Sequence, residues 1–142
     1  MDPADALDRA RRCAESMYAA DRASRQLGIE ISDVSPGCAT AAMVVREDMV
    51  NGHGICHGGY VFTLADTAFA FACNTYDERT VAAGADVSFL EAVAVGDRLV
   101  ARATERTRRG RSGLYDVTVT RADGVPVAEF RGRSRSLGRP LL

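Results

Sequence analysis

The sequence predicts an α+β fold in which antiparallel strands wrap one apolar helix. Residues 58–74 have helical spacing and are almost wholly apolar, and a helix that is apolar on all sides belongs in a protein interior. From residue 80 onward, β-type segments alternate with short turn signals. Because consecutive strands joined by short turns run antiparallel, we expect a curved sheet of five to six antiparallel strands around this long central helix.

The residues before the central helix predict a further helix and two strands. Apolar residues recur at helical spacing over residues 4–27, and Gly28 is a typical residue at which a helix ends. Residues 29–31 alternate as a strand does, and residues 38–45, after a Ser-Pro-Gly turn, predict a second strand. Residues 46–57 are expected to form a polar loop that leads into the central helix.

Four segments after the central helix are expected to be strands. Turn signals separate them, and the last separator contains Asp-Gly, which favours a hairpin. The expected strands are Thr80 to Leu90, Asp97 to Arg106, Leu114 to Arg121 and Val125 to Ser136.

The length and hydropathy of the chain predict a single cytoplasmic domain. A chain of 142 residues has the size of one domain, here residues 1–142. The longest uninterrupted apolar run, residues 68–73, is far shorter than the ~20 residues of a membrane-spanning helix. The acidic first residues lack the basic flank and apolar stretch of a signal peptide. The four cysteines include no Cys-x-x-Cys pair and are expected to be reduced thiols.

Charge is almost balanced over the whole chain but uneven along it. The formal net charge of −1 argues against a nucleic-acid-binding protein. Residues 1–96 carry 7 Arg and 14 acidic residues, whereas residues 97–142 carry 11 Arg and 5 acidic residues. In the basic part, Arg108, Arg109 and Arg111 share a glycine-rich turn that is a candidate site for phosphate groups. A solvated turn is an equally good interpretation.

Asp66 is the only acidic residue of the apolar helix. An ionised carboxylate in apolar surroundings is costly unless it is paired. Two interpretations are therefore open: a structural Asp that binds the backbone or Thr63, and an active-site carboxylate that reaches a cleft.

The loop before the helix favours the second interpretation. It runs from Asn51 to Gly59 and contains several glycines, which allow a ligand carbonyl to approach the backbone closely. The first turn of a helix has free N–H groups, and its dipole favours negative charge. N–H donors that face a developing oxyanion, together with a carboxylate, suit acyl transfer. Gly58 and Asp66 lie about 12 Å apart along a helix axis, so we expect a site shared across a dimer.

Two other interpretations of the loop are open. His53, Cys56, His57 and Asp66 are residue types that bind zinc. However, nothing else in the sequence supplies a firmly anchored fourth ligand beside the loop residues, and a zinc site would leave the glycines unexplained, so we expect no metal. Alternatively, the loop is purely structural and His57 binds the backbone.

Seven short motifs, spread over nearly the whole chain, carry a family resemblance. They are Asn51-Gly52-His53-x-x-Cys56-His57-Gly58-Gly59, Leu64-Ala65-Asp66-Thr67-Ala68-Phe69-Ala70, Ala72-Cys73-Asn74, Asp86-Val87-Ser88-Phe89-Leu90, Gly96-Asp97, Gly113-Leu114-Tyr115-Asp116-Val117 and Phe130-Arg131-Gly132-Arg133-Ser134. This set resembles the phenylacetate-degradation (PaaI-type) hotdog thioesterases, and the first motif is highly specific to that family. The resemblance implies a hotdog fold, dimers that join their sheets edge to edge, and pairing of these dimers into tetramers.

The resemblance also implies roles for single residues. Asp66 is the catalytic carboxylate and acts on a substrate held by the other subunit, where the N–H of Gly58 polarises the thioester carbonyl. Asn51 holds the carbonyl or the attacking water, and His57 supports the loop. Residues 81–83 contain no Ser or Thr, which some relatives use to position water. The remaining substrate-binding candidates are Gly59, Phe62 and Thr67, the residue that follows Asp66. Arg108, Arg109 and Arg111 of the glycine-rich turn complete this set.

The reaction that the resemblance implies is hydrolysis of an acyl-CoA thioester, of the aryl-acetyl class that includes phenylacetyl-CoA and its hydroxylated forms. Asp66 acts either as nucleophile or as general base, and no metal or redox cofactor is expected. Two alternatives are a hotdog hydratase or dehydratase and a non-catalytic acyl-CoA-binding protein, because the fold alone does not separate these functions.

Overall fold

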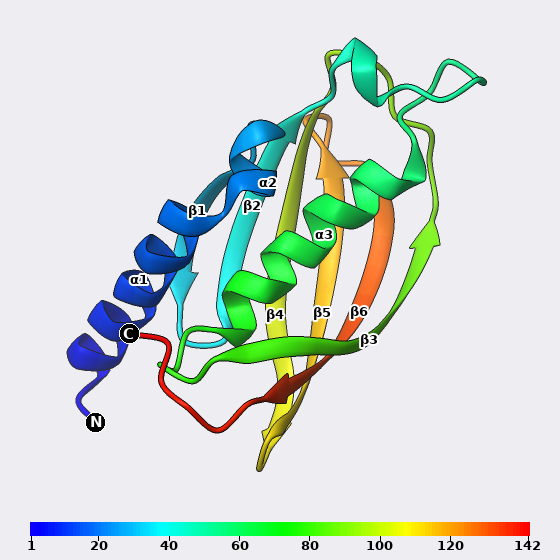
Figure 1. The fold of residues 1–142 in the computed structure, drawn as a ribbon. Coiled ribbons are helices and arrows are strands. Elements are labelled where there is room, and N and C mark those ends of the chain that lie inside the picture. Colours follow the sequence, from blue (N-terminus) through cyan, green and yellow to red (C-terminus); the bar gives the residue numbers. More distant parts are fainter.

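A six-stranded antiparallel sheet wraps around one long helix in the computed structural model, which describes residues 1–142. Figure 1 shows this helix, α3, lying across the concave face of the sheet. The strand order is β1-β2-β4-β5-β6-β3. The helices are α1 (Pro3–Ala20), α2 (Arg22–Gln26) and α3 (Gly58–Cys73), with a short 3-10 helix at Glu47–Met49; the strands are β1 (Glu30–Ser35), β2 (Cys38–Val44), β3 (Thr80–Phe89), β4 (Arg98–Arg109), β5 (Ser112–Arg121) and β6 (Pro126–Ser136).

This arrangement confirms the predicted fold class, whereas several element boundaries differ from the prediction; β1, for example, extends to Ser35, and Glu47–Met49 of the expected loop forms a 3-10 helix. Two of the differences have a clear physical cause. The helix expected over residues 4–27 is divided at Asp21, whose carboxylate accepts hydrogen bonds from the backbone N–H (2.9 Å) and hydroxyl (2.6 Å) of Ser24. An Asp at this position caps a new helix, which explains the break. The β4–β5 hairpin is tighter than expected, because Arg109 pairs with Ser112 and only two residues connect the strands. Gly110, with φ 57°, suits the first position of such a turn.

The central helix buries most of its surface against the sheet. Its buried side chains contact β2, β4 and β5 most extensively, and they join side chains of these strands in one hydrophobic core. The opposite side of α3 is more open: Gly59 is exposed, and Thr63, Asp66 and Ala70 are half-buried. Asp66 therefore lies on the open side of an otherwise buried helix. No helix of the protein combines the length and the apolar character that crossing a membrane requires.

The two edges of the sheet differ. At one edge, α1 packs against β1 (Figure 1). At the other, β3 is ten residues long, carries Asp86 as its only charged residue and exposes apolar side chains such as Val81 (46%) and Phe89 (55%). A long and weakly charged edge strand is a template for pairing with another chain.

Candidate active site

The first turn of α3 is capped and held by His57. The side-chain Nδ1 of His57 accepts a hydrogen bond from the N–H of Gly59 at 2.9 Å, and the backbone N–H of His57 donates to the carbonyl of Met49 at 2.7 Å. The next contact along the loop joins the N–H of Cys56 to the carbonyl of Val93 at 2.8 Å. These hydrogen bonds join His57 to the start of α3 and to Met49, and the resemblance interprets them as support of the loop.

Asn51 organises the loop through its side-chain oxygen. That oxygen accepts from the N–H groups of His53 (2.9 Å) and Ile55 (3.4 Å), while the backbone carbonyl accepts from Gly54 (3.0 Å). The side-chain amide nitrogen of Asn51 donates to no protein group. It is therefore the atom that Asn51 can offer to a substrate carbonyl or a water.

Gly58 presents a free donor at the start of α3. Its N–H belongs to the first turn, which has no intrahelical acceptors, and neither a side chain nor a loop carbonyl accepts from it. The ring of Phe89 lies against this residue. A Cβ atom on Gly58 would lie only 3.0 Å from Cζ of Phe89. The N-terminal end of α3 thus has a free N–H with an aromatic ring beside it.

Asp66 has no hydrogen-bonding or ionic partner within the chain. Thr63 donates instead to the carbonyl of Gly59 at 2.8 Å, and the buried Thr67 donates to the carbonyl of Thr63 at 2.7 Å. The structural interpretation, in which Thr63 or the backbone holds the carboxylate, is therefore not what the structure shows. Burial raises the pKa of Asp66 above the usual value of an aspartate. A half-buried, unpaired acid with a perturbed pKa is typical of functional sites.

One chain does not bring Asp66 and Gly58 together. Both residues belong to the continuous helix α3 and lie about 12 Å apart along its axis. A thioester carbonyl bound at the N–H of Gly58 is thus out of reach of Asp66 of the same chain. The arrangement supports the prediction of a site completed by a second chain.

The four residues considered as zinc ligands do not gather. No three His, Cys, Asp or Glu side chains form a group with the geometry to hold a metal ion. Within the loop, Nδ1 of His57 already accepts from Gly59, and Cys56 is buried with its thiol near the carbonyl of His57.

The arginine turn lies at the other end of α3. Arg108 and Arg111 line a small cavity together with Cys73, the last residue of the helix. Since α3 has 16 residues, about 24 Å separate its two ends. The guanidinium of Arg108 stacks on the ring of Tyr76 at 3.5 Å and lies 3.8 Å from Glu105. Arg109 is exposed and forms no ion pair, which makes it the least constrained member of the turn.

The other substrate-binding candidates are partly used by the fold. The ring of Phe62 packs edge-on against Phe130 at 5.4 Å, and the N–H of Gly59 is taken by His57. The hydroxyl of Thr67 faces its own helix. Sequence analysis did not place Phe89 among the site residues, although Asp86-Val87-Ser88-Phe89-Leu90 belongs to the motif set; its contact with Gly58 arises only when β3 closes the sheet around α3.

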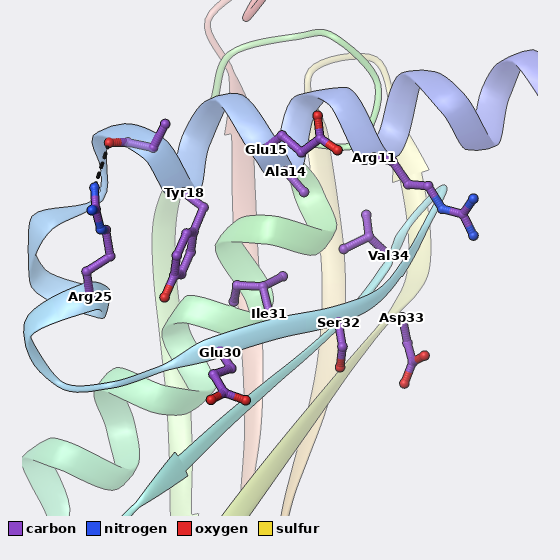
Figure 2. Close-up of a pocket in the computed structure, with 11 residues that line it drawn as sticks. Arg11, Ala14, Glu15, Tyr18, Arg25, Glu30, Ile31, Ser32, Asp33 and Val34 are labelled. Atoms are coloured by element: carbon purple, nitrogen blue, oxygen red, sulfur yellow. Dashed lines mark hydrogen bonds between the residues drawn. The ribbon is translucent and has the colours of Figure 1, made fainter.

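A groove lies elsewhere on the molecule. It has a volume of about 900 Å³ and lies between α1 and β1, as Figure 2 shows. Tyr18 and Ile31 are among its lining residues, together with charged side chains such as Arg11 and Glu30. No residue of α3 or of the loop 51–57 lines it. This groove is therefore separate from the candidate active site.

Comparisons with known proteins identify the family of this chain. The family model of the thioesterase superfamily matches residues 53–128. Acyl-coenzyme A thioesterase PaaI of Escherichia coli is 41% identical over 125 residues, which cover 88% of this chain and 89% of that protein. The structure of the E. coli PaaI protein from the phenylacetic acid degradation operon superposes with a TM-score of 0.93 at 39% identity, and covers 94% of this chain and 97% of that one. A variant of the phenylacetic acid degradation protein PaaI from Thermus thermophilus superposes with a TM-score of 0.79 at 36% identity, over 82% of this chain and 100% of that one.

Proposed function

This chain belongs to the thioesterase superfamily, as a PaaI-like hotdog acyl-CoA thioesterase, and we propose that its substrates are aryl-acetyl-CoA thioesters. The observation that carries the catalytic assignment is the unpaired, half-buried carboxylate of Asp66. The choice of phenylacetyl-CoA and its ring-hydroxylated forms follows the PaaI relatives. The proposed setting is phenylacetate degradation in the cytoplasm.

In the proposed mechanism, the N–H of Gly58 donates to the thioester carbonyl oxygen. Negative charge develops on this oxygen as the carbonyl carbon becomes tetrahedral, and the positive end of the α3 dipole stabilises it. The amide nitrogen of Asn51 is available for the same oxygen or for the attacking water. His57 takes no part in the chemistry and keeps the first turn of α3 in place.

Asp66 of the second subunit supplies the carboxylate. As a general base it takes a proton from water, whose oxygen bonds to the carbonyl carbon. As a nucleophile it bonds to that carbon itself, and water then hydrolyses the resulting anhydride. In both routes the C–S bond breaks, the electron pair leaves on sulfur, and the thiolate of coenzyme A takes up a proton.

The proposed assembly is a dimer joined through β3, with two dimers forming a tetramer. The bare edge of β3 and the separation of Gly58 from Asp66 support the dimer. Two chains related by a twofold axis form two equivalent sites, each with Gly58 from one chain and Asp66 from the other.

The proposed substrate is tested by comparing acyl groups. We expect a higher kcat/KM for phenylacetyl-CoA and its hydroxylated forms than for palmitoyl-CoA, measured as release of free thiol. A clear preference for palmitoyl-CoA would contradict the aryl-acetyl assignment. Enoyl-CoA that gains water without releasing thiol would indicate the hydratase alternative. Acyl-CoA that binds but stays intact would indicate a non-catalytic binding protein.

The arginine turn is tested with Arg109→Ala and Arg111→Ala. If these side chains bind the phosphates of coenzyme A, each substitution raises KM by about 3- to 30-fold and leaves kcat nearly unchanged, because such binding is equal in ground and transition states. The defect should shrink for a substrate carried on truncated pantetheine, which has no nucleotide phosphates. Arg108→Ala is a poorer probe, since it also removes the contact with Tyr76. Unchanged KM values would indicate that the arginine turn is solvated and does not bind coenzyme A.

A further inference from the structure

Phe89 differs from the other aromatic residues of this protein in its contacts and in its exposure. The chain has five Phe and four Tyr residues, and all but Phe89 have an aromatic, histidine or guanidinium partner. Phe89 is also the only one that is exposed, at 55%. An aromatic side chain that buries little surface within its own chain is available to contact a ligand or a partner.

The ring of Phe89 lies against the first turn of α3. A Cβ atom on Gly58 would meet three atoms of this ring, Cζ at 3.0 Å and the two Cε atoms at 3.3 and 3.4 Å. The backbone that carries the ring is fixed, because Phe89 pairs with Ala128 of β6 and the N–H of Leu90 donates to the carbonyl of Val127 at 2.8 Å. The ring and the free N–H of Gly58 are therefore neighbours on a rigid frame.

We infer that Phe89 determines specificity by packing against the aromatic ring of the acyl group; this inference rests on the proposed function. In phenylacetyl-CoA a single methylene separates the carbonyl from the ring. A carbonyl that accepts from the N–H of Gly58 thus holds its own aromatic ring close to Gly58, where the exposed ring of Phe89 lies. Aromatic pairs prefer offset or edge-to-face contacts, which an exposed ring at a helix end permits.

The aromatic residues nearer to Asp66 in the sequence are less suited to this role. Phe62 packs on Phe130, and Phe69 packs on both Tyr115 and Phe130. Tyr60 lies edge-on to His57 and so belongs to the loop support. Only Phe89 combines an unpartnered ring with a position beside the proposed carbonyl donor.

The experiment compares Phe89→Leu with the wild-type enzyme on phenylacetyl-CoA and hexanoyl-CoA, which have acyl groups of similar reach. We expect kcat/KM for phenylacetyl-CoA to fall about tenfold and that for hexanoyl-CoA to change less than about twofold. Phe89→Tyr should restore the aromatic preference. Leu90→Ala is the matched control, because Leu90 is similarly exposed (52%) and the three atoms nearest to a Cβ on Gly58 all belong to Phe89. Its ratio of the two kcat/KM values should stay that of the wild type.

Three results would overturn the inference. Equal losses on both substrates would make Phe89 a general support of the α3 terminus. A change of oligomeric state in Phe89→Leu, measured by light scattering at the assay concentration, would assign the ring to the subunit interface. An unchanged substrate ratio would show that the acyl group lies elsewhere.

A binding measurement tests this inference separately from the proposed function. The probe is an inert thioether analogue of phenylacetyl-CoA, titrated calorimetrically against both proteins. Weaker binding to Phe89→Leu, together with a larger loss of kcat/KM for phenylacetyl-CoA than for hexanoyl-CoA, supports the inference even if the wild-type enzyme fails to prefer phenylacetyl-CoA in turnover. In that case only the proposed substrate is wrong. Equal binding of the analogue to the two proteins would reject the role of Phe89 whatever the turnover shows.

Discussion

Replacing Asp66 by Asn is expected to remove nearly all thioester hydrolysis while the protein stays folded. Asn keeps the shape of the side chain but neither takes up a proton nor attacks a carbonyl. A positioned general base contributes about 10²- to 10⁴-fold to the rate, so kcat should fall by at least about 10²-fold. Thiol release at saturating phenylacetyl-CoA measures this effect. Hydrolysis that survives in the folded variant would remove Asp66 from the mechanism.

The same substitution is expected to leave the melting temperature unchanged or to raise it. Burial raises the pKa of Asp66 in the folded state above its value in the unfolded chain. The folded protein therefore binds the proton more tightly, and stability is lost as pH rises through the interval between the two pKa values. Above that interval the wild type bears the full cost of the unpaired charge, whereas the neutral amide of the variant bears none.

The pH dependence of stability is the control for this explanation. At a pH below the unfolded pKa the two proteins should melt together, and the advantage of Asp66→Asn should appear as the pH rises above that pKa. Protein concentration must be held constant, because the stability of an oligomer depends on it. A clearly lower melting temperature of the variant at neutral pH would instead indicate a structural carboxylate. The raised pKa also predicts that the acid limb of kcat lies above the pKa of an ordinary aspartate.

Local sequence patterns predicted the fold because each element carries its own signal. The apolar segment 58–74 indicated a buried helix, and the turn signals after residue 80 indicated antiparallel strands. Element ends were less predictable. Asp21 caps α2 within a segment whose apolar spacing looks continuous, and Arg108 and Arg109 extend β4 where the glycine-rich segment suggested a turn. In both cases hydrogen bonds with a neighbouring strand or residue determine where the element ends. The composition of the segment does not reveal these hydrogen bonds.

The candidate site was partly predictable for the same reason. Asp66 and the loop that ends at Gly58 stand out in the sequence because a lone acid and clustered glycines break an apolar pattern. The contact between Phe89 and Gly58 joins the end of β3 to the start of α3, and only the curvature of the sheet creates it. Likewise, the charge count of residues 97–142 did not predict that Arg108 stacks on Tyr76. Such pairings depend on tertiary register.

Replacing Gly58 by Pro is expected to remove the proposed carbonyl donor and leave α3 in place. Gly58 is the first residue of the helix, a position that Pro favours because its missing N–H has no intrahelical acceptor. The preceding residue, His57, already has the extended conformation (φ −60°, ψ 132°) that a following Pro requires. Loss of one oxyanion donor typically lowers kcat by ~10²- to 10³-fold, and we expect a loss in that range.

Gly58→Ala is the matched control. Its Cβ meets the ring of Phe89 at the same 3.0 Å, but its N–H is retained. The ring is exposed and contacts Gly58 through its outer atoms, so it can move aside in both variants. We expect Gly58→Ala to keep most of the activity. Equal losses in the two variants would mean that displacement of Phe89, and not loss of the N–H, causes the defect.

Mixing the two inactive proteins tests whether the site is shared. In a dimer of one Asp66→Asn chain and one Gly58→Pro chain, one site combines the intact Gly58 of the first chain with the intact Asp66 of the second. The other site lacks both groups. With complete random exchange, half of the dimers are mixed and each has one intact site of two, so activity should return to about a quarter of the wild-type value. Tagged chains recovered together would verify the exchange. If verified mixed dimers remain inactive, Gly58 and Asp66 act within one chain. The substrate would then have to span the roughly 12 Å that separate these two residues along α3.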